Sequence, residues 1–318
     1  MKRISILLCL LFSTLIVSET TQGEVYPNKP VTIMQAFGVG GSSDMLIRGV
    51  SPYLIKELKT QIVIQNVPGA GGVIGYNKFY KLPPDGYNLL FTNFPTPYTA
   101  ELNSESDYYR TREFEPISAF AKDYIIVAVH PDTFQNADEF IKAARSRSLR
   151  IGVTGVGVTG RGGNLNGYIL EKSLGVHFTF VPYPSGGASL TALAGNHIDA
   201  VVTPSSSAAN LVRAKRIKLL LAYADERRPQ YPQVPTLKEL GYGPVEVYFL
   251  YGAFAPPRIP QGRLQILEKA FGRAVTNPSF VEWIQKGTLE YINLNARAFK
   301  AEVEKLMSAT DHYREFIK

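Results

Sequence analysis

Short apolar runs alternate with longer amphipathic segments along most of the chain. The short runs are rich in Val and Ile and are bounded by Gly, Pro, Asn or Asp, which favours strands. The longer segments place apolar residues at helical spacing. This alternation is typical of an α/β fold, in which helices cover a largely parallel sheet. We expect strands over residues 30–34, 61–65, 88–92, 124–129, 150–154, 178–181, 200–203, 218–222 and 249–255. We expect helices over 45–58, 73–81, 138–147, 165–174, 263–275, 278–286 and 298–316.

The loops that follow several of these strands are unusually rich in Gly, Ser and Thr. They span residues 38–44, 66–72 and 155–163. Ligands of open α/β sheets bind at the carboxyl ends of the strands. Glycine lets main-chain N–H groups approach an anion closely, and the helix that follows adds a partial positive charge. The loops therefore predict a binding site built from backbone donors and hydroxyl groups.

The N-terminus has the features of a secretory signal peptide. Lys2 and Arg3 precede an apolar run over residues 4–17, which is shorter than the roughly 20 residues of a membrane span. Small and polar residues follow, so we expect residues 1–23 to be removed by cleavage near Gly23. The interpretation implies export to the periplasm.

Composition narrows the function classes further. The single cysteine, Cys9, lies inside the N-terminal apolar run without the small preceding residues of a lipoprotein site, so no lipid anchor is expected. The processed chain then has no thiol, which excludes disulfides and thiolate catalysis. The net charge of +7 comes from small basic groups without a continuous basic stripe, so nucleic acid is not expected as a partner.

Eight short motifs occur in order from Tyr26 onward, and together they resemble one family. They are Tyr26-Pro-x-Lys-Pro30, Gly40-Gly-x-x-Asp44, Asn66-x-Pro-Gly-Ala-Gly-Gly-x-Ile-Gly75, Pro84-Asp-Gly-Tyr87, Phe114-x-Pro-Ile117, Val181-Pro-Tyr183, Gly195-x-x-Ile-Asp199 and Val234-Pro-Thr-x-x-Glu-x-Gly241. The series resembles the Bug family, the periplasmic substrate-binding receptors of tripartite tricarboxylate transporters (TTT). The resemblance extends over nearly the whole chain from Tyr26.

The resemblance implies a fold and a function. The fold is a periplasmic-binding-protein type II-like α/β fold, with two α/β lobes joined by two crossing strands and the ligand in the cleft. Lobe one corresponds to residues 24–126 plus 230–318 and lobe two to 127–229, with crossings at 124–129 and 218–222. The implied protein is a monomeric receptor that captures a small organic carboxylate (a di- or tricarboxylate or an aromatic acid). It delivers this ligand to the large and small integral-membrane subunits of a transporter, without catalysis and without a cofactor.

The resemblance also implies which residues bind the ligand, with main-chain N–H groups and hydroxyls holding a carboxylate. On lobe one these are Phe37, Gly40, Gly41, Ser42, Ala70, Gly71, Gly72, Asn93 and Thr96. On lobe two they are Thr154, Gly155, Thr159, Arg161, Asn164, Tyr183, Ser185, Pro204, Ser205 and Ser206. We interpret Asp44 as the N-cap of the following helix and not as a ligand contact.

The sequence departs from the family pattern at positions that bear on the ligand. Val67, Asn164 and Pro184 stand where Arg, His and Lys are common, and Arg161 stands where a small hydroxyl residue is common. Arg161 is flanked by glycines, so its guanidinium either binds a second ligand carboxylate or points to solvent. The first alternative implies a dicarboxylate.

Other function classes are compatible with parts of the sequence. Residues 155–160 fit G-x-G-x-x-G, but the acidic residue of a dinucleotide site is missing about 20 residues further on. The four histidines are scattered and predict no metal site. A periplasmic sensor that feeds a sensor kinase is an alternative output of the same fold. An exported serine hydrolase that uses Ser42 or Ser185 with a distant histidine is the alternative from a different class.

Overall fold

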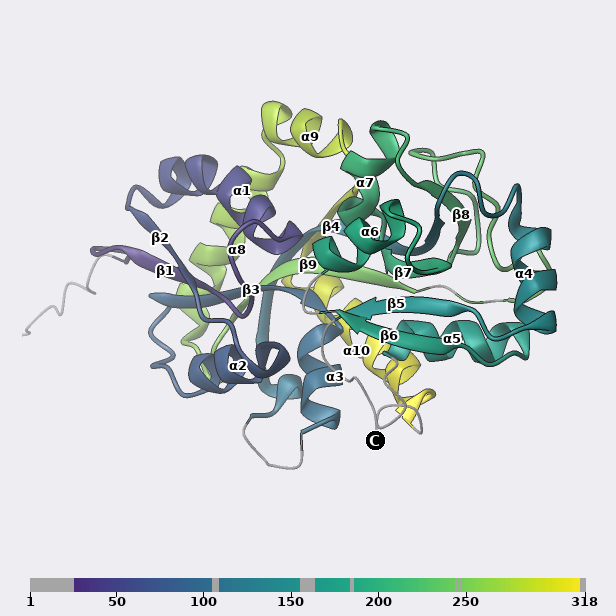
Figure 1. The fold of residues 1–318 in the computed structure, drawn as a ribbon. Helices are drawn as coiled ribbons and strands as arrows, with labels where there is room; N and C mark the ends of the chain where they lie inside the picture. The colour runs from purple at the N-terminus through teal and green to yellow at the C-terminus, as the bar shows by residue number, and fades with distance from the viewer. Residues whose placement is uncertain are drawn as a thin grey trace, which may run out of the picture.

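The computed structural model of the 318-residue chain describes residues 26–104, 109–154, 164–183, 186–243, 245 and 247–314. Two groups of strands and helices lie side by side along one long strand, β4 (Figure 1). We name the group around strands β1–β3 the first lobe and the group around strands β5–β8 the second lobe.

The first lobe is built on a mixed sheet in the order β2-β1-β3-β9-β4, with β10 also paired to β4. β1 is parallel to β2 and β3, whereas β9 runs antiparallel between β3 and β4. The carboxyl ends of β1 and β3 therefore meet at one edge, where an α/β sheet binds ligands. The strands are β1 (Val31–Gln35), β2 (Ile62–Asn66), β3 (Asn88–Phe94), β4 (Glu115–Val129), β9 (Tyr248–Ala255) and β10 (Glu290–Asn295).

The second lobe continues the same sheet in the order β4-β7-β5-β6, and β8 also pairs with β4. β5 is parallel to β6 and to β7, so the carboxyl ends of these three strands also share an edge. The strands are β5 (Arg150–Thr154), β6 (Thr179–Tyr183), β7 (Ala200–Pro204) and β8 (Lys218–Ala222).

The chain crosses between the lobes at two adjacent positions. On β4, Tyr124 still pairs with Tyr248 of the first lobe, whereas Ile125 pairs with Pro204 of the second. The return crossing lies beside it, since the Ile125 N–H donates to the carbonyl of Val247 (3.2 Å). The second crossing is therefore not at 218–222 as expected. Strand β8 pairs with the second-lobe part of β4, and apolar periodicity does not tell a crossing strand from an ordinary one.

Helices cover both faces of this sheet. Those of the first lobe are α1 (Ser42–Leu58), α2 (Val73–Tyr80), α3 (Thr96–Leu102), α8 (Gln261–Val275), α9 (Pro278–Gln285) and α10 (Ala296–Asp311). Those of the second lobe are α4 (Ala137–Ser146), α5 (Leu165–Leu174), α6 (Gly186–Ala194) and α7 (Ser205–Arg213). Two short 3₁₀ turns, η1 (Ala70–Gly72) and η2 (Thr111–Glu113), lie in loops.

Each lobe has its own apolar cores on the two faces of its part of the sheet. The segment before β9 belongs to the second lobe by its packing, because Tyr231, Val234, Leu237 and Val245 are buried in second-lobe clusters. The sequence interpretation assigned this segment to lobe one. The lobe boundaries themselves stay a prediction.

Several elements differ from the sequence expectations. β4 begins at Glu115 instead of residue 124, and α10 begins at Ala296 instead of residue 298. Helices α3, α6 and α7 and strand β10 were not expected, because Ser, Thr, Gly and Pro at the helix starts are also typical of loops. Among the described helices, none is both long and apolar enough to cross a membrane.

Candidate ligand-binding site

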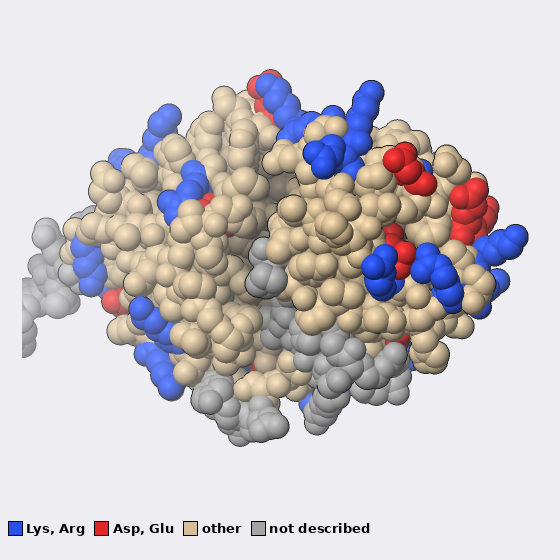
Figure 2. All heavy atoms as spheres, in the orientation of Figure 1, with Lys and Arg blue, Asp and Glu red and all other residues tan. Residues whose placement is uncertain are grey.

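A cavity of about 730 Å³ lies between the two lobes, at the edge where the strands end. Figure 2 shows that the surface is hollowed where the lobes meet. The cavity walls come from α1 and β3 of the first lobe, α5, β7 and α7 of the second, and the segments β9 and α10. A volume in the range of about 300–1,000 Å³ is typical of sites for small organic ligands.

The N-terminus of α1 forms the first wall. Gly40 has a left-handed backbone (φ 86°), which ends the loop after β1, and α1 then begins at Ser42. No side chain caps this helix at Gly41. The first turn of a helix leaves N–H groups without helical partners, so Ser42 and Ser43 present donors at the cavity.

Asp44 lies in the first turn of α1 and also lines the cavity, but its carboxylate is already engaged. It accepts hydrogen bonds from the Gly40 N–H (3.0 Å), from Arg48 Nε (2.9 Å) and from Asn66 Nδ2 (3.2 Å). The hydrogen bond from Arg48 is the main cause that lowers the pKa of Asp44. The interpretation of Asp44 as an N-cap is wrong in its details, since Gly41 occupies that position and Asp44 follows inside the helix. Its role is to fix the loop before α1.

The end of β3 and the start of α3 form the second wall. Asn93, Thr96 and Thr99 line the cavity here. The Oδ1 atom of Asn93 is buried and has no hydrogen-bond partner among the residues that the structure describes. A buried acceptor without a partner is costly, so an occupant of the cavity with a group that donates a hydrogen bond to this oxygen is favoured.

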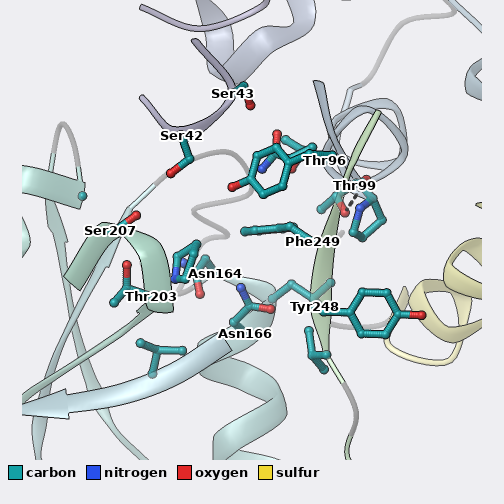
Figure 3. A pocket seen from close by; sticks show the side chains of 18 of the residues that line it. Ser42, Ser43, Thr96, Thr99, Asn164, Asn166, Thr203, Ser207, Tyr248 and Phe249 are labelled. Atoms are coloured by element: carbon teal, nitrogen blue, oxygen red, sulfur yellow. Dashed lines mark hydrogen bonds between the residues drawn. The ribbon is translucent and has the colours of Figure 1, made fainter. Parts of the chain in front are cut away.

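The second lobe contributes the start of α5 and the turn from β7 to α7. Asn164 is the N-cap of α5, because its Oδ1 accepts from the Gly167 N–H (3.0 Å), and it also lines the cavity. Thr203 and Ser207 place hydroxyl groups on the same wall, and in Figure 3 both lie across the cavity from Thr96.

A buried network connects the two lobes beside the cavity. The hydroxyls of Ser42 and Ser206 lie 2.8 Å apart, and Ser206 donates to the carboxylate of Asp123. Asp123 also accepts from the Ser205 hydroxyl (2.8 Å) and the Ser206 N–H (3.2 Å), at the N-terminus of α7. Burial raises the pKa of Asp123, and these hydrogen bonds only partly offset the effect. Ser42 is therefore paired with another serine in the described part of the chain, and not with an imidazole as a serine hydrolase requires.

The remaining wall comes from residues that the sequence interpretation missed. They lie on the β9 crossing and on the last helix: Val245, Val247, Tyr248, Phe249, Tyr251, Leu306, Ala309, Thr310, His312 and Tyr313. No lysine or arginine occurs among the described residues that line the cavity. The donors that the described lining offers a ligand are thus backbone N–H groups, hydroxyls, amides and the imidazole of His312.

The expected site residues fall into three groups. Those that line the cavity are Phe37, Gly41, Ser42, Asn93, Thr96, Asn164 and Pro204. Those placed elsewhere are Gly40 beside it, Ala70, Gly71 and Gly72 in η1, Tyr183 at the end of β6, and Ser205 and Ser206, whose hydroxyls donate to Asp123. Gly155, Thr159, Arg161 and Ser185 lie outside the described residues, as does the side chain of Thr154.

The glycines of η1 have a structural reason to be there. A Cβ added at Gly72 lies 2.6 Å from the Tyr76 ring, and Gly72 has a φ of 99°. The backbone conformation and the packing against Tyr76 both require glycine here. Contact between this turn and a ligand stays a prediction.

Comparison with known proteins shows the family to which the chain belongs. Residues 46–309 match the family model TctC, described as "Tripartite tricarboxylate transporter family receptor". A curated relative from Cupriavidus necator, the "UPF0065 protein in gbd 5'region", is 29% identical over 303 residues, which cover 90% of this chain and 90% of that protein.

Two solved structures share the fold. The periplasmic binding protein BugD is 24% identical with a TM-score of 0.78, and the match covers 91% of this chain and 97% of BugD. MatC from Rhodopseudomonas palustris, solved with bound malate, is 23% identical with a TM-score of 0.78, and the match covers 92% and 100% of the two chains. The expected α/β periplasmic-binding fold is confirmed.

Proposed function

Because the chain belongs to the tripartite tricarboxylate transporter receptor family, we propose that it binds a small organic carboxylate between its lobes and delivers it to transporter subunits in the membrane. The observation that carries this proposal is the cavity between the lobes, whose described walls offer hydrogen-bond donors and no nucleophile–base pair. The malate bound to MatC, which has the same fold, supports a carboxylate as the ligand class.

The carboxylate group is best accommodated at the α1 wall. Main-chain N–H groups of the first turn of α1 lie there, Asn93 lines the same cavity, and the positive end of the α1 dipole favours an anion. The neighbouring carboxylate of Asp44 is neutralised by Arg48, which reduces its repulsion of the ligand.

The proposal includes the cellular context that the sequence predicts. A signal peptide over residues 1–23 exports the chain to the periplasm, where it acts without a lipid anchor. The two lobes move about the crossings at Tyr124–Ile125 and Val247–Tyr248. Contacts from both lobes make the closed form bind the ligand more tightly.

Titration calorimetry with the purified mature chain tests the proposal. A panel of mono-, di- and tricarboxylates and aromatic acids is expected to include at least one ligand with saturable 1:1 binding. Ligand recovered after long incubation is expected to be chemically unchanged. Absence of binding across the panel, or consumption of the ligand at a rate proportional to the protein concentration, contradicts the receptor function.

A further inference from the structure

The two ends of the cavity differ in chemistry. In Figure 3, Ser42 and Ser43 lie at one end and Asn166 lies at the other, with Phe249 projecting from β9 between them. The end near Ser42 is polar, as described above. The other end lies between α5, the β9 crossing and α10.

The wall of this second end is apolar and comes from three elements. Leu165 and Ile169 are one turn apart on α5, and Val247 and Phe249 share one face of the crossing strand. All four pack with Val245 in one apolar cluster of the second lobe. Leu306 and Ala309 of α10 close the cavity from the first lobe.

The polar groups at this end do not form a second anion site. The hydroxyl of Thr310 donates to the Leu306 carbonyl within α10 (2.8 Å). The side chains of Asn166, His312 and Tyr313 are further polar groups there, and the first turn of α5 adds main-chain N–H groups, but no lysine or arginine occurs in the part of the lining that the structure describes. A second carboxylate at this end loses water without gaining a fixed positive partner, which is unfavourable. An alkyl or aryl group gains from leaving water.

We propose that the ligand is a carboxylate with an apolar body, an alkyl chain or an aromatic ring, which lies between α5, β9 and α10. This inference rests on the proposed function and specifies its ligand class. It differs from the dicarboxylate that the sequence suggests through Arg161, and the two hypotheses predict opposite preferences.

Calorimetry with three acids of similar length decides between them: phenylacetate, hexanoate and adipate. The apolar-body ligands are expected to bind at least about 10-fold more tightly than adipate, which carries the unpaired second charge. Tighter binding of adipate overturns the inference. A loss of that adipate affinity in Arg161→Ala then assigns the second carboxylate to Arg161.

A charge placed at the apolar end provides a second test. Ala309 is exposed within the cavity wall, so Ala309→Arg adds a guanidinium there with little effect on folding. The variant is expected to bind adipate more tightly and hexanoate more weakly than the original chain. Ser308→Arg is the matched control, since Ser308 is also exposed on α10 but does not line the cavity, and it should leave both affinities unchanged.

The outcomes separate this inference from the proposed function. Saturable binding of any carboxylate in the panel keeps the receptor function, whichever acid binds best. Unchanged preferences in Ala309→Arg contradict the placement of the apolar body against α10. Binding by none of the acids contradicts the inference and the receptor function together.

Discussion

The hydroxyl oxygens of Ser42 and Ser206 lie 2.8 Å apart, although the two residues belong to different lobes. Ser42 begins α1, and Ser206 lies in the first turn of α7. Ser206 donates its only hydroxyl proton to Asp123, so Ser42 is the donor to Ser206. The arrangement of the lobes seen here therefore includes a direct hydrogen bond that an open arrangement lacks.

Removal of this bond should favour the open form. We expect Ser206→Ala to weaken ligand binding about 2- to 10-fold, the value of one ordinary hydrogen bond. The ligand itself need not contact Ser206, which does not line the cavity. Calorimetry measures the loss, and small-angle scattering should show a larger radius of gyration for Ser206→Ala than for the original chain at equal sub-saturating ligand.

A double-mutant cycle separates this effect from a ligand contact of Ser42. If the two hydroxyls act on each other, Ser42→Ala combined with Ser206→Ala should cost no more than the larger single change. Fully additive losses contradict the interlobe bond as the cause.

Asp123 should give the folding stability a distinctive pH dependence. Its pKa is raised in the folded chain by burial, above the value of about 3.9 in an unfolded chain. At pH values between the pKa of Asp123 in the unfolded chain and its higher pKa in the folded chain, the folded state binds more protons than the unfolded state. The contribution of Asp123 to the free energy of unfolding is therefore lost as the pH rises through the folded pKa.

The Asp123→Asn variant tests this expectation. Asparagine keeps an oxygen acceptor for Ser205 and the Ser206 N–H, while its charge does not change with pH. Urea unfolding at a series of pH values from 4 upward should show a smaller loss of stability with rising pH in the variant. Parallel pH profiles for the two chains contradict a raised pKa at Asp123.

The sequence predicts correctly those elements whose bounds are set by neighbouring residues in the chain. The bounds of β5, β8 and α5 match the sequence expectation residue for residue, because apolar periodicity and the flanking Asn164 and Gly175 define them locally. The loop after β1 was also found from its glycines, and it does lie at the cavity.

The part that could not be predicted depends on contacts between distant residues. Asp123 lies on β4, and its partner Ser205 is 82 residues away in sequence. The donors of Ser205 and Ser206 were expected at the ligand, but an internal carboxylate engages them. The contribution of α10 was missed for the same reason, since only the folded chain brings Ala309 beside residues of α5 and β9.

Asn93 should matter for the ligand more than for the fold. Its buried Oδ1 has no partner in the described part of the chain, so Asn93→Leu, which has nearly the same shape, removes an unsatisfied acceptor. We expect unfolding of the ligand-free variant at the same or a slightly higher urea concentration. Ligand binding should weaken about 3- to 10-fold, because the amide is lost from the cavity. Lower stability together with unchanged affinity contradicts a role in the site.

The apolar end of the cavity should respond to a change of polarity at constant shape. Val247→Thr replaces one methyl group by a hydroxyl in the wall formed by Val247 and Phe249. The hydroxyl must lose water when an alkyl or aryl group packs on it, so phenylacetate should bind about 3- to 10-fold more weakly.

Propionate, which is too short to reach from the α1 wall to this end, should lose little affinity, and this outcome also shows that the crossing at Val247 still functions. Val63→Thr on β2 is the matched control, since Val63 is 48% exposed and does not line the cavity. If Val247→Thr weakens the binding of propionate and phenylacetate equally, the effect comes from the crossing and not from the apolar wall.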